Sequence, residues 1–232
     1  MITRVLWAGL IAGLIAGAFA TTIQLARLVP LIAVAEEYEA AAAHSAMAHD
    51  HGDGRESSVA ASTDSDEWEP TGLARPAFTA LFNALAGVGY GLLLVAGMTI
   101  AGRPTDRTTG LLWGLAGFIA FAAAPALGLP PELPGMPAAD LLARQAWWIG
   151  TAAATAAGLA ALAFGGPVVK AIGVALLLAP HAIGAPHAPD HTGGTGVPAE
   201  IAAEFVAASL LSALVFWLAL GASAGHFLRR PT

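Results

Sequence analysis

The chain has 232 residues, of which 56% are hydrophobic and 11% are charged, whereas roughly 25% of the residues of a soluble domain are charged. This composition excludes an ordinary soluble domain and predicts a membrane protein. The net charge of -6 comes without a basic patch, so nucleic-acid binding is excluded. The chain has no cysteine, which leaves nitrogen and oxygen as the ligands for any bound metal.

Apolar segments of about 20 residues, long enough to cross a bilayer as a helix, recur along the whole chain. We expect an all-α fold, a polytopic bundle of six transmembrane helices in a single integral membrane domain over residues 1–232. The fourth and fifth segments are divided only by Gly165-Gly166-Pro167 and Lys170, so a merged pair giving five helices is the alternative. The six predicted spans run from Val5 to Leu28, Ala77 to Ala101, Leu111 to Leu127, Ala146 to Phe164, Val168 to Ile183 and Ile201 to Gly225.

The first predicted span carries a packing signal. Gly9, Gly13 and Gly17 recur every four residues, which places them on one helix face and predicts close contact with another helix. A signal peptide cleaved after Ala18-Phe19-Ala20 is the alternative for this segment. The apolar pattern continues to Ala35, which favours an uncleaved helix.

The positive charges predict the orientation, because short cytoplasmic loops collect Lys and Arg. With six spans and the amino terminus inside, Arg55, Arg75 and Arg144 fall outside. We therefore expect a multi-pass protein of the inner (cytoplasmic) membrane with both termini in the cytoplasm. The basic residues placed inside are Arg4, Arg103, Arg107, Lys170, Arg229 and Arg230.

Two external loops follow from this orientation. The first is a long polar His/acidic loop at about residues 40–70, partly disordered because it is rich in Ser, Asp and Gly. Pro30 suits the first turn of a helix leading into it, on which Glu36 and Glu39 are neighbours at i, i+3. The second loop, from Gly184 to Glu200, carries four further candidates, His187, Asp190, His191 and Glu200, after a helix that ends near His181.

Imidazole and carboxylate groups suit divalent ions such as Co(II), Ni(II) and Zn(II). The sequence therefore predicts that the two loops capture a transition metal at the outer mouth, with no cofactor bound permanently. The alternative is that these are solvated polar loops in which the histidines have no ligand role. The candidate metal ligands are His44, His49, His51, His181, His187, His191, Glu36, Glu39, Asp190 and Glu200.

Isolated polar residues within the apolar segments have packing or pathway interpretations. Gln24 and Asn83 are uncharged and are expected to hydrogen-bond between helices, or else to line a path. Arg27 lies near the end of the first span and needs a partner, for which Glu36 and Glu204 are the candidates. The chain has no GxSxG, HExxH or GxxxxGK[ST] motif, so we do not expect an enzyme.

A proline-rich block, Leu129 to Pro137, cannot be helical and predicts a stiff external connection. It is either a rigid hairpin between the third and fourth spans or a plug over the outer mouth. Asp140 and Arg144 follow at i, i+4 spacing and are expected to pair at the start of the next helix.

Several stretches resemble the CbtA-type family of proposed cobalt transporter subunits: LVPLIAVAEEYE at Leu28 to Glu39, GLLWGLAGF at Gly110 to Phe118, the run from Pro125 to Ala160, PHAIGAP at Pro180 to Pro186 and PAEIAAEFVAASL at Pro198 to Leu210. The resemblance covers nearly the whole chain except about Ala40 to Asp66. It implies cobalt uptake for cobalamin synthesis with a small single-span, His-containing partner subunit. It also implies five spans, where the charge pattern favours six. A non-transporting membrane scaffold, or a metal-binding partner of another transporter, is the alternative function.

Overall fold

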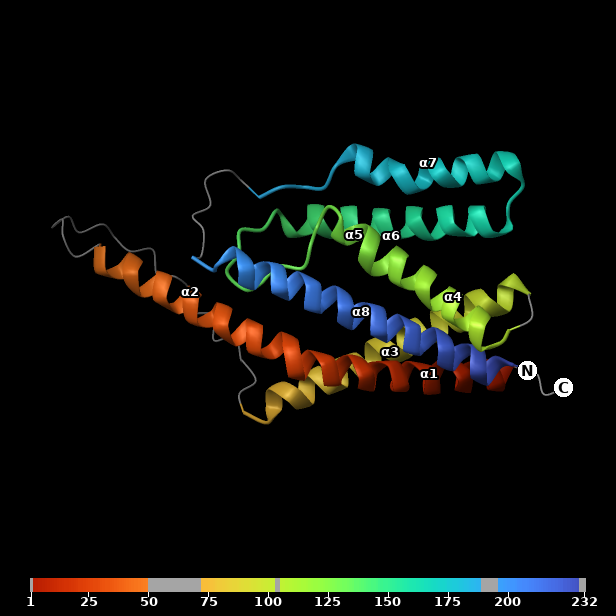
Figure 1. Ribbon diagram of the computed structural model, residues 1–232, viewed down its shortest axis with the longest axis horizontal. Coiled ribbons are helices and arrows are strands. Elements are labelled where there is room, and N and C mark those ends of the chain that lie inside the picture. Colours follow the sequence, from red (N-terminus) through yellow and green to blue (C-terminus); the bar gives the residue numbers. More distant parts are fainter. Residues whose placement is uncertain (1, 50–71, 103–104, 189–195, 230–232) are drawn as a thin grey trace.

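The computed structural model describes residues 2–49, 72–102, 105–188 and 196–229, and all regular structure in these ranges is helical (Figure 1). The all-α prediction is therefore confirmed. The elements are α1 (Ile2–Ile23), η1 (Gln24–Leu28), α2 (Val29–His49), α3 (Ala74–Ala101), α4 (Arg107–Phe118), η3 (Ile119–Ala123), α5 (Ala124–Ala126), α6 (Leu141–Phe164), α7 (Pro167–Ile183) and α8 (Ala199–Leu228).

Five helices are long and apolar enough to cross a membrane, within the described residues, and α7 is a shorter apolar helix of 17 residues. Its axis of about 25 Å is close to the roughly 30 Å of a bilayer core. α6 and α7 lie side by side as separate antiparallel helices (Figure 1). The fourth and fifth predicted spans are therefore two helices and not one merged span, because Gly165 and Gly166 end one helix and Pro167 suits the first turn of the next.

The first helix is continuous through α1, η1 and α2. Within it η1 is a single π-helical turn, in which the Val29 N–H donates to the Gln24 carbonyl five residues earlier. A second π-helical turn, η3, joins α4 to α5, and there the Ala124 N–H donates to the Ile119 carbonyl. Each turn widens its helix locally, as π-bulges do.

Glycine contacts hold α1 against α3. A Cβ built on Gly13 would overlap the Gly87 carbonyl oxygen, and one built on Gly9 would lie against Gly91 and Leu92. Gly17 approaches the Asn83 backbone in the same way. The close packing predicted from the four-residue repeat is therefore confirmed, because only glycine lets two backbones approach this closely.

Close glycine contacts also join two other helix pairs. Gly110 and Gly114 on α4 meet Gly221 and Gly225 on α8, and α6 meets α7 at Gly158 and Gly173. Small residues therefore set the distance between helices in each of these three antiparallel pairs, in a setting where no hydrophobic effect drives helices together.

Larger side chains fill the space between α1, α3 and α8. Val95, Met98 and Leu220 are fully buried there. Trp217 stacks on Phe121, with ring centroids 5.4 Å apart, and Tyr90 meets the same indole edge-on at 5.1 Å. This aromatic group connects η3 to the core of the bundle.

α1 begins and α8 ends at the same end of the bundle, which we call the terminal end (Figure 1). The Arg4 guanidinium donates to the Leu228 carbonyl at 3.0 Å and also to the Arg229 carbonyl. At the opposite end, which we call the loop end, α2 projects beyond the other helices. Ala35, Leu133 and Phe205 form a second buried cluster there.

The proline-rich block belongs to that second cluster and is not helical. Its Glu132 carboxylate pairs with the Arg144 guanidinium at 2.7 Å. Asp140 instead accepts a hydrogen bond from the Ala143 amide at 2.9 Å. The expected Asp140–Arg144 pair is wrong, because an N-cap carboxylate turns toward the free backbone amides of its own helix.

Candidate functional site

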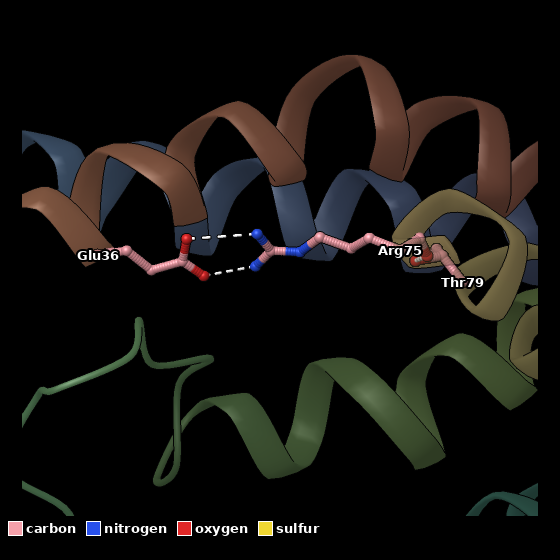
Figure 2. Close-up of polar contacts among 3 residues, drawn as sticks. All are labelled: Glu36, Arg75 and Thr79. Atoms are coloured by element: carbon pink, nitrogen blue, oxygen red, sulfur yellow. Dashed lines mark hydrogen bonds and ion pairs between the residues drawn. The ribbon is translucent and has the colours of Figure 1, made fainter. Parts of the chain in front are cut away.

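An ion pair joins α2 to the start of α3 at the loop end. Both terminal nitrogens of the Arg75 guanidinium face the Glu36 carboxylate (Figure 2), with Nη1 to Oε2 at 3.3 Å and a second contact between Nη2 and Oε1. The two side chains are 41% and 43% exposed, respectively. Glu36 therefore pairs with Arg75 and not with Arg27, whose side chain is exposed. The sequence interpretation placed Glu36 and Arg75 on the same side of the membrane but did not predict that they pair.

A second polar contact lies deeper between the same two helices. Asn83 Nδ2 on α3 donates to Gln24 Oε1 at 2.9 Å and to Thr21 Oγ1 at 3.1 Å. The interhelical hydrogen bonding expected of Gln24 and Asn83 is therefore present. Gln24 is also the first residue of the π-helical turn η1, so the widened turn supplies one of these acceptors.

These contacts form a polar track along the interface of α3 with α1 and α2. Arg75, Thr79 and Asn83 recur every four residues on one face of α3, and they span about 12 Å of its axis. The track ends one turn further along α3, where the backbones of Gly87 and Gly13 touch. It therefore leads from the loop end into the bundle and stops at a closed contact.

Two of the described histidines, His181 and His187, lie near the loop end in different surroundings, whereas His226 is exposed in the last turn of α8, at the terminal end. His181 is half-buried in the last turn of α7, and its ring meets the Trp147 indole edge-on at a centroid distance of 6.3 Å. His187 follows that helix and is exposed. Glu200 and Glu204 are exposed on the first turns of α8.

The structure does not assemble the predicted metal site from the residues that it describes. Among the side chains that the structure describes, no three His, Asp or Glu groups lie together as metal ligands. Glu39 is exposed on α2, one turn from Glu36. His44 and His49 belong to α2, but their side chains fall outside the description, and His51, Asp190, His191 and the loop at about 40–70 lie outside the described residues altogether.

The interior offers no charged side chain to a passing ion, among the described residues. The buried polar side chains there are the hydroxyls of Thr151, Thr155 and Ser212. Glu204, a pathway candidate, is exposed near the start of α8 and not inside the bundle. The charged groups of the site therefore lie near the loop end, where α2, α3 and α8 begin or project.

Comparison with known proteins identifies the chain by family. Residues 2–229 match the family described as probable cobalt transporter subunit (CbtA). No curated protein matches the chain, and no solved structure does. Because the match covers essentially the whole chain, including all eight α-helices in the described residues, the protein belongs to the CbtA family of probable cobalt transporter subunits.

Proposed function

We propose that the protein is the membrane subunit of a divalent transition-metal uptake transporter that carries Co(II) for cobalamin synthesis. The family match over residues 2–229 is the observation that carries this proposal. Ni(II) and Zn(II) are competing cargoes, because imidazole and carboxylate ligands suit all three ions. The metal is cargo and not a resident cofactor.

In this proposal the loop end faces the outside of the inner membrane and captures the ion. The exposed groups Glu39, His187 and Glu200 lie at that end. The terminal end, which carries Arg4 and Arg229, faces the cytoplasm in accord with the positive-inside rule. The candidate ligands outside the described side chains, namely His44, His49, His51, Asp190 and His191, complete the capture site in the full protein.

The proposal includes a partner, since the family description names a subunit. The expected partner is a small single-span, His-containing membrane protein. The polar track supports the need for a second component or a second conformation, because its route into the bundle is closed where Gly13 meets Gly87.

The second candidate function is a non-transporting scaffold or metal-binding partner of another transporter. The observation that favours it is the interior, where the described buried polar side chains are hydroxyls and none is charged. A cation crossing the bilayer core normally meets carboxylates or other polar groups that replace its hydration.

Metal flux into liposomes separates the two functions. The purified protein is reconstituted alone around a trapped cobalt-sensitive fluorophore, and Co(II) or Mg(II) is added outside. A saturable Co(II) signal without a Mg(II) signal supports the permease subunit. Co(II) binding without flux, in protein that is correctly folded, supports the scaffold. Absence of both binding and flux contradicts any role in handling the metal.

A further inference from the structure

A cavity of about 670 Å³ opens beside the proline-rich block, away from the polar track. Its walls come from three parts of the chain: Phe121 to Glu132, the start of α6, and the middle of α8 from Ser209 to Ala213. Along α6 it follows Leu141 to Ile149, about 12 Å of helix axis. Its volume falls within the range of about 300–1,000 Å³ that holds small-molecule ligands.

The cavity is amphipathic. Phe121, Trp148, Ile149 and Leu210 give it apolar walls. The charged side chains among its described lining residues are Glu132 and Arg144, which pair with each other and remain 23% and 30% exposed. An apolar slot therefore runs beside one cation and one anion that a ligand can reach.

The position of the cavity corresponds to the edge of a membrane. Arg144, Trp147 and Trp148 lie in the first two turns of α6, and Trp and Arg are typical of the boundary between headgroups and hydrocarbon. The remaining wall residues of α6 and α8 continue into apolar spans. A molecule held here has its polar part at the boundary and its apolar part among side chains.

We propose that this cavity binds a zwitterionic phospholipid with a phosphoethanolamine headgroup. The Arg144 guanidinium takes the phosphate, the Glu132 carboxylate takes the primary ammonium, and one acyl chain lies along Phe121 and Leu210. A guanidinium and a phosphate fit each other through paired N–H donors. When the headgroup replaces the ion pair between Glu132 and Arg144, each of the two side chains gains a new partner of opposite charge. The ion pair that is lost is partly exposed, so its loss costs the protein little stability.

Charge complementarity selects this occupant over a metal ion or an anionic lipid. A divalent cation on Glu132 would lie beside the Arg144 guanidinium, which is 2.7 Å from that carboxylate, and would be repelled by it. An anionic headgroup would satisfy Arg144 but leave Glu132 without its counter-charge. The zwitterion supplies both charges.

Native mass spectrometry of the purified, delipidated full chain tests the proposal. The protein is titrated with phosphatidylethanolamine, phosphatidylcholine and phosphatidylglycerol that share the same acyl chains. Phosphatidylethanolamine is expected to bind about tenfold more tightly than phosphatidylcholine, whose quaternary ammonium has no N–H to donate to Glu132. Equal binding of all three lipids, or tightest binding of phosphatidylglycerol, overturns the proposal.

Two cavity variants and a matched control make the test specific. Glu132→Gln keeps the side-chain shape and should abolish the preference for phosphatidylethanolamine over phosphatidylcholine. Ala213→Trp fills the apolar slot and should weaken the binding of all three lipids. Arg75→Gln breaks the other ion pair of the loop end, outside the cavity, and should leave lipid binding unchanged. Lipid preference that survives Glu132→Gln, or a photo-crosslinker at Leu210 that captures protein and no lipid, contradicts the assignment.

Discussion

Gly13 on α1 and Gly87 on α3 touch backbone to backbone, so that a Cβ on either residue would overlap the carbonyl oxygen of the other. Gly89 lies on the same helix as Gly87 but has no neighbouring atom within 4 Å of its own Cβ position. Substitution of Gly87 and of Gly89 therefore separates the effect of helix packing on stability from the effect of helix propensity.

Gly87→Ala is expected to destabilise the protein by about 1–3 kcal/mol, the usual cost of overpacking. Gly89→Ala, the matched control, should be neutral or stabilise by up to about 1 kcal/mol, because Ala favours helix over Gly. Thermal unfolding of both variants in the same detergent measures the difference. Equal midpoints for the two variants would show that α1 and α3 do not make this contact.

The hydrogen bond between Asn83 and Gln24 should contribute modestly to stability. Interhelical hydrogen bonds in membrane proteins average about 0.6 kcal/mol and reach about 1.7 kcal/mol. A double-mutant cycle of Asn83→Ala and Gln24→Ala should give a coupling in this range. Asn83→Ala alone should cost more, since it also removes the bond to Thr21. Strict additivity of the two substitutions would contradict the contact.

The absence of cysteine from the native chain allows single-cysteine labelling of the topology. Cysteine at Thr3, Lys170 and Arg229 should react with a membrane-impermeant maleimide from the cytoplasmic side, and cysteine at Glu39 or Glu200 from the opposite side. All five positions are exposed. Lys170 is decisive for α7, because it lies at the start of that helix. Labelling of Lys170→Cys from the Glu39 side would refute six crossings.

Metal capture should weaken as the pH falls from about 7.5 to about 5.5, because imidazole binds metal when neutral and gains its proton in this range. Titration calorimetry with Co(II), Ni(II) and Mg(II) at the two pH values measures this. Replacement of His44, His49, His51, His187 and His191 by Ala should remove both the Co(II) affinity and its pH dependence. Unchanged Co(II) affinity in that variant, or Co(II) binding no tighter than Mg(II), would leave the histidines without a ligand role.

Asp106, which caps α4, should make the protein acid-sensitive. The hydrogen bond from the Thr109 amide, at 2.6 Å, lowers the pKa of Asp106 below its ordinary value of 3.8. Its stabilisation is fully present above that ordinary value and is lost as the pH falls through the lower folded-state value. Asp106→Asn keeps an acceptor that does not titrate. Its thermal midpoint should therefore fall less than that of the native chain between pH 6 and pH 3, and parallel curves would contradict the linkage.

The helix boundaries show what sequence patterns can predict. The fourth predicted span and α6 both end at Phe164, because the break at Gly165 and Gly166 is encoded locally. Their starts differ: Ala146 was predicted and Leu141 is observed, since hydropathy does not register the Asp140 cap or the polar first turns. The first helix runs on to His49 through a π-helical turn that no local pattern predicted.

The site was less predictable, because its contacts depend on which helices become neighbours. The sequence interpretation offered Glu36 as a partner for Arg27 and did not predict its pairing with Arg75. The choice of Arg75 follows from the glycine contacts that hold α3 against α1, many residues away. Likewise, Glu132 meets Arg144 because the proline-rich block folds back onto α6.

The π-helical turn η1 acts as a one-residue insertion in an otherwise regular helix. Each residue of an α-helix advances the chain by about 100° around the axis. If this stretch wound as a regular α-helix with no residue removed, α2 would rotate by about that angle relative to α1, whereas the wider π-helical turn absorbs the extra residue. Glu36 would then leave the side of α3 and lose Arg75, although no residue of the ion pair had changed. In this stretch the backbone geometry of the turn, and not the identity of its side chains, keeps the two groups of the ion pair aligned.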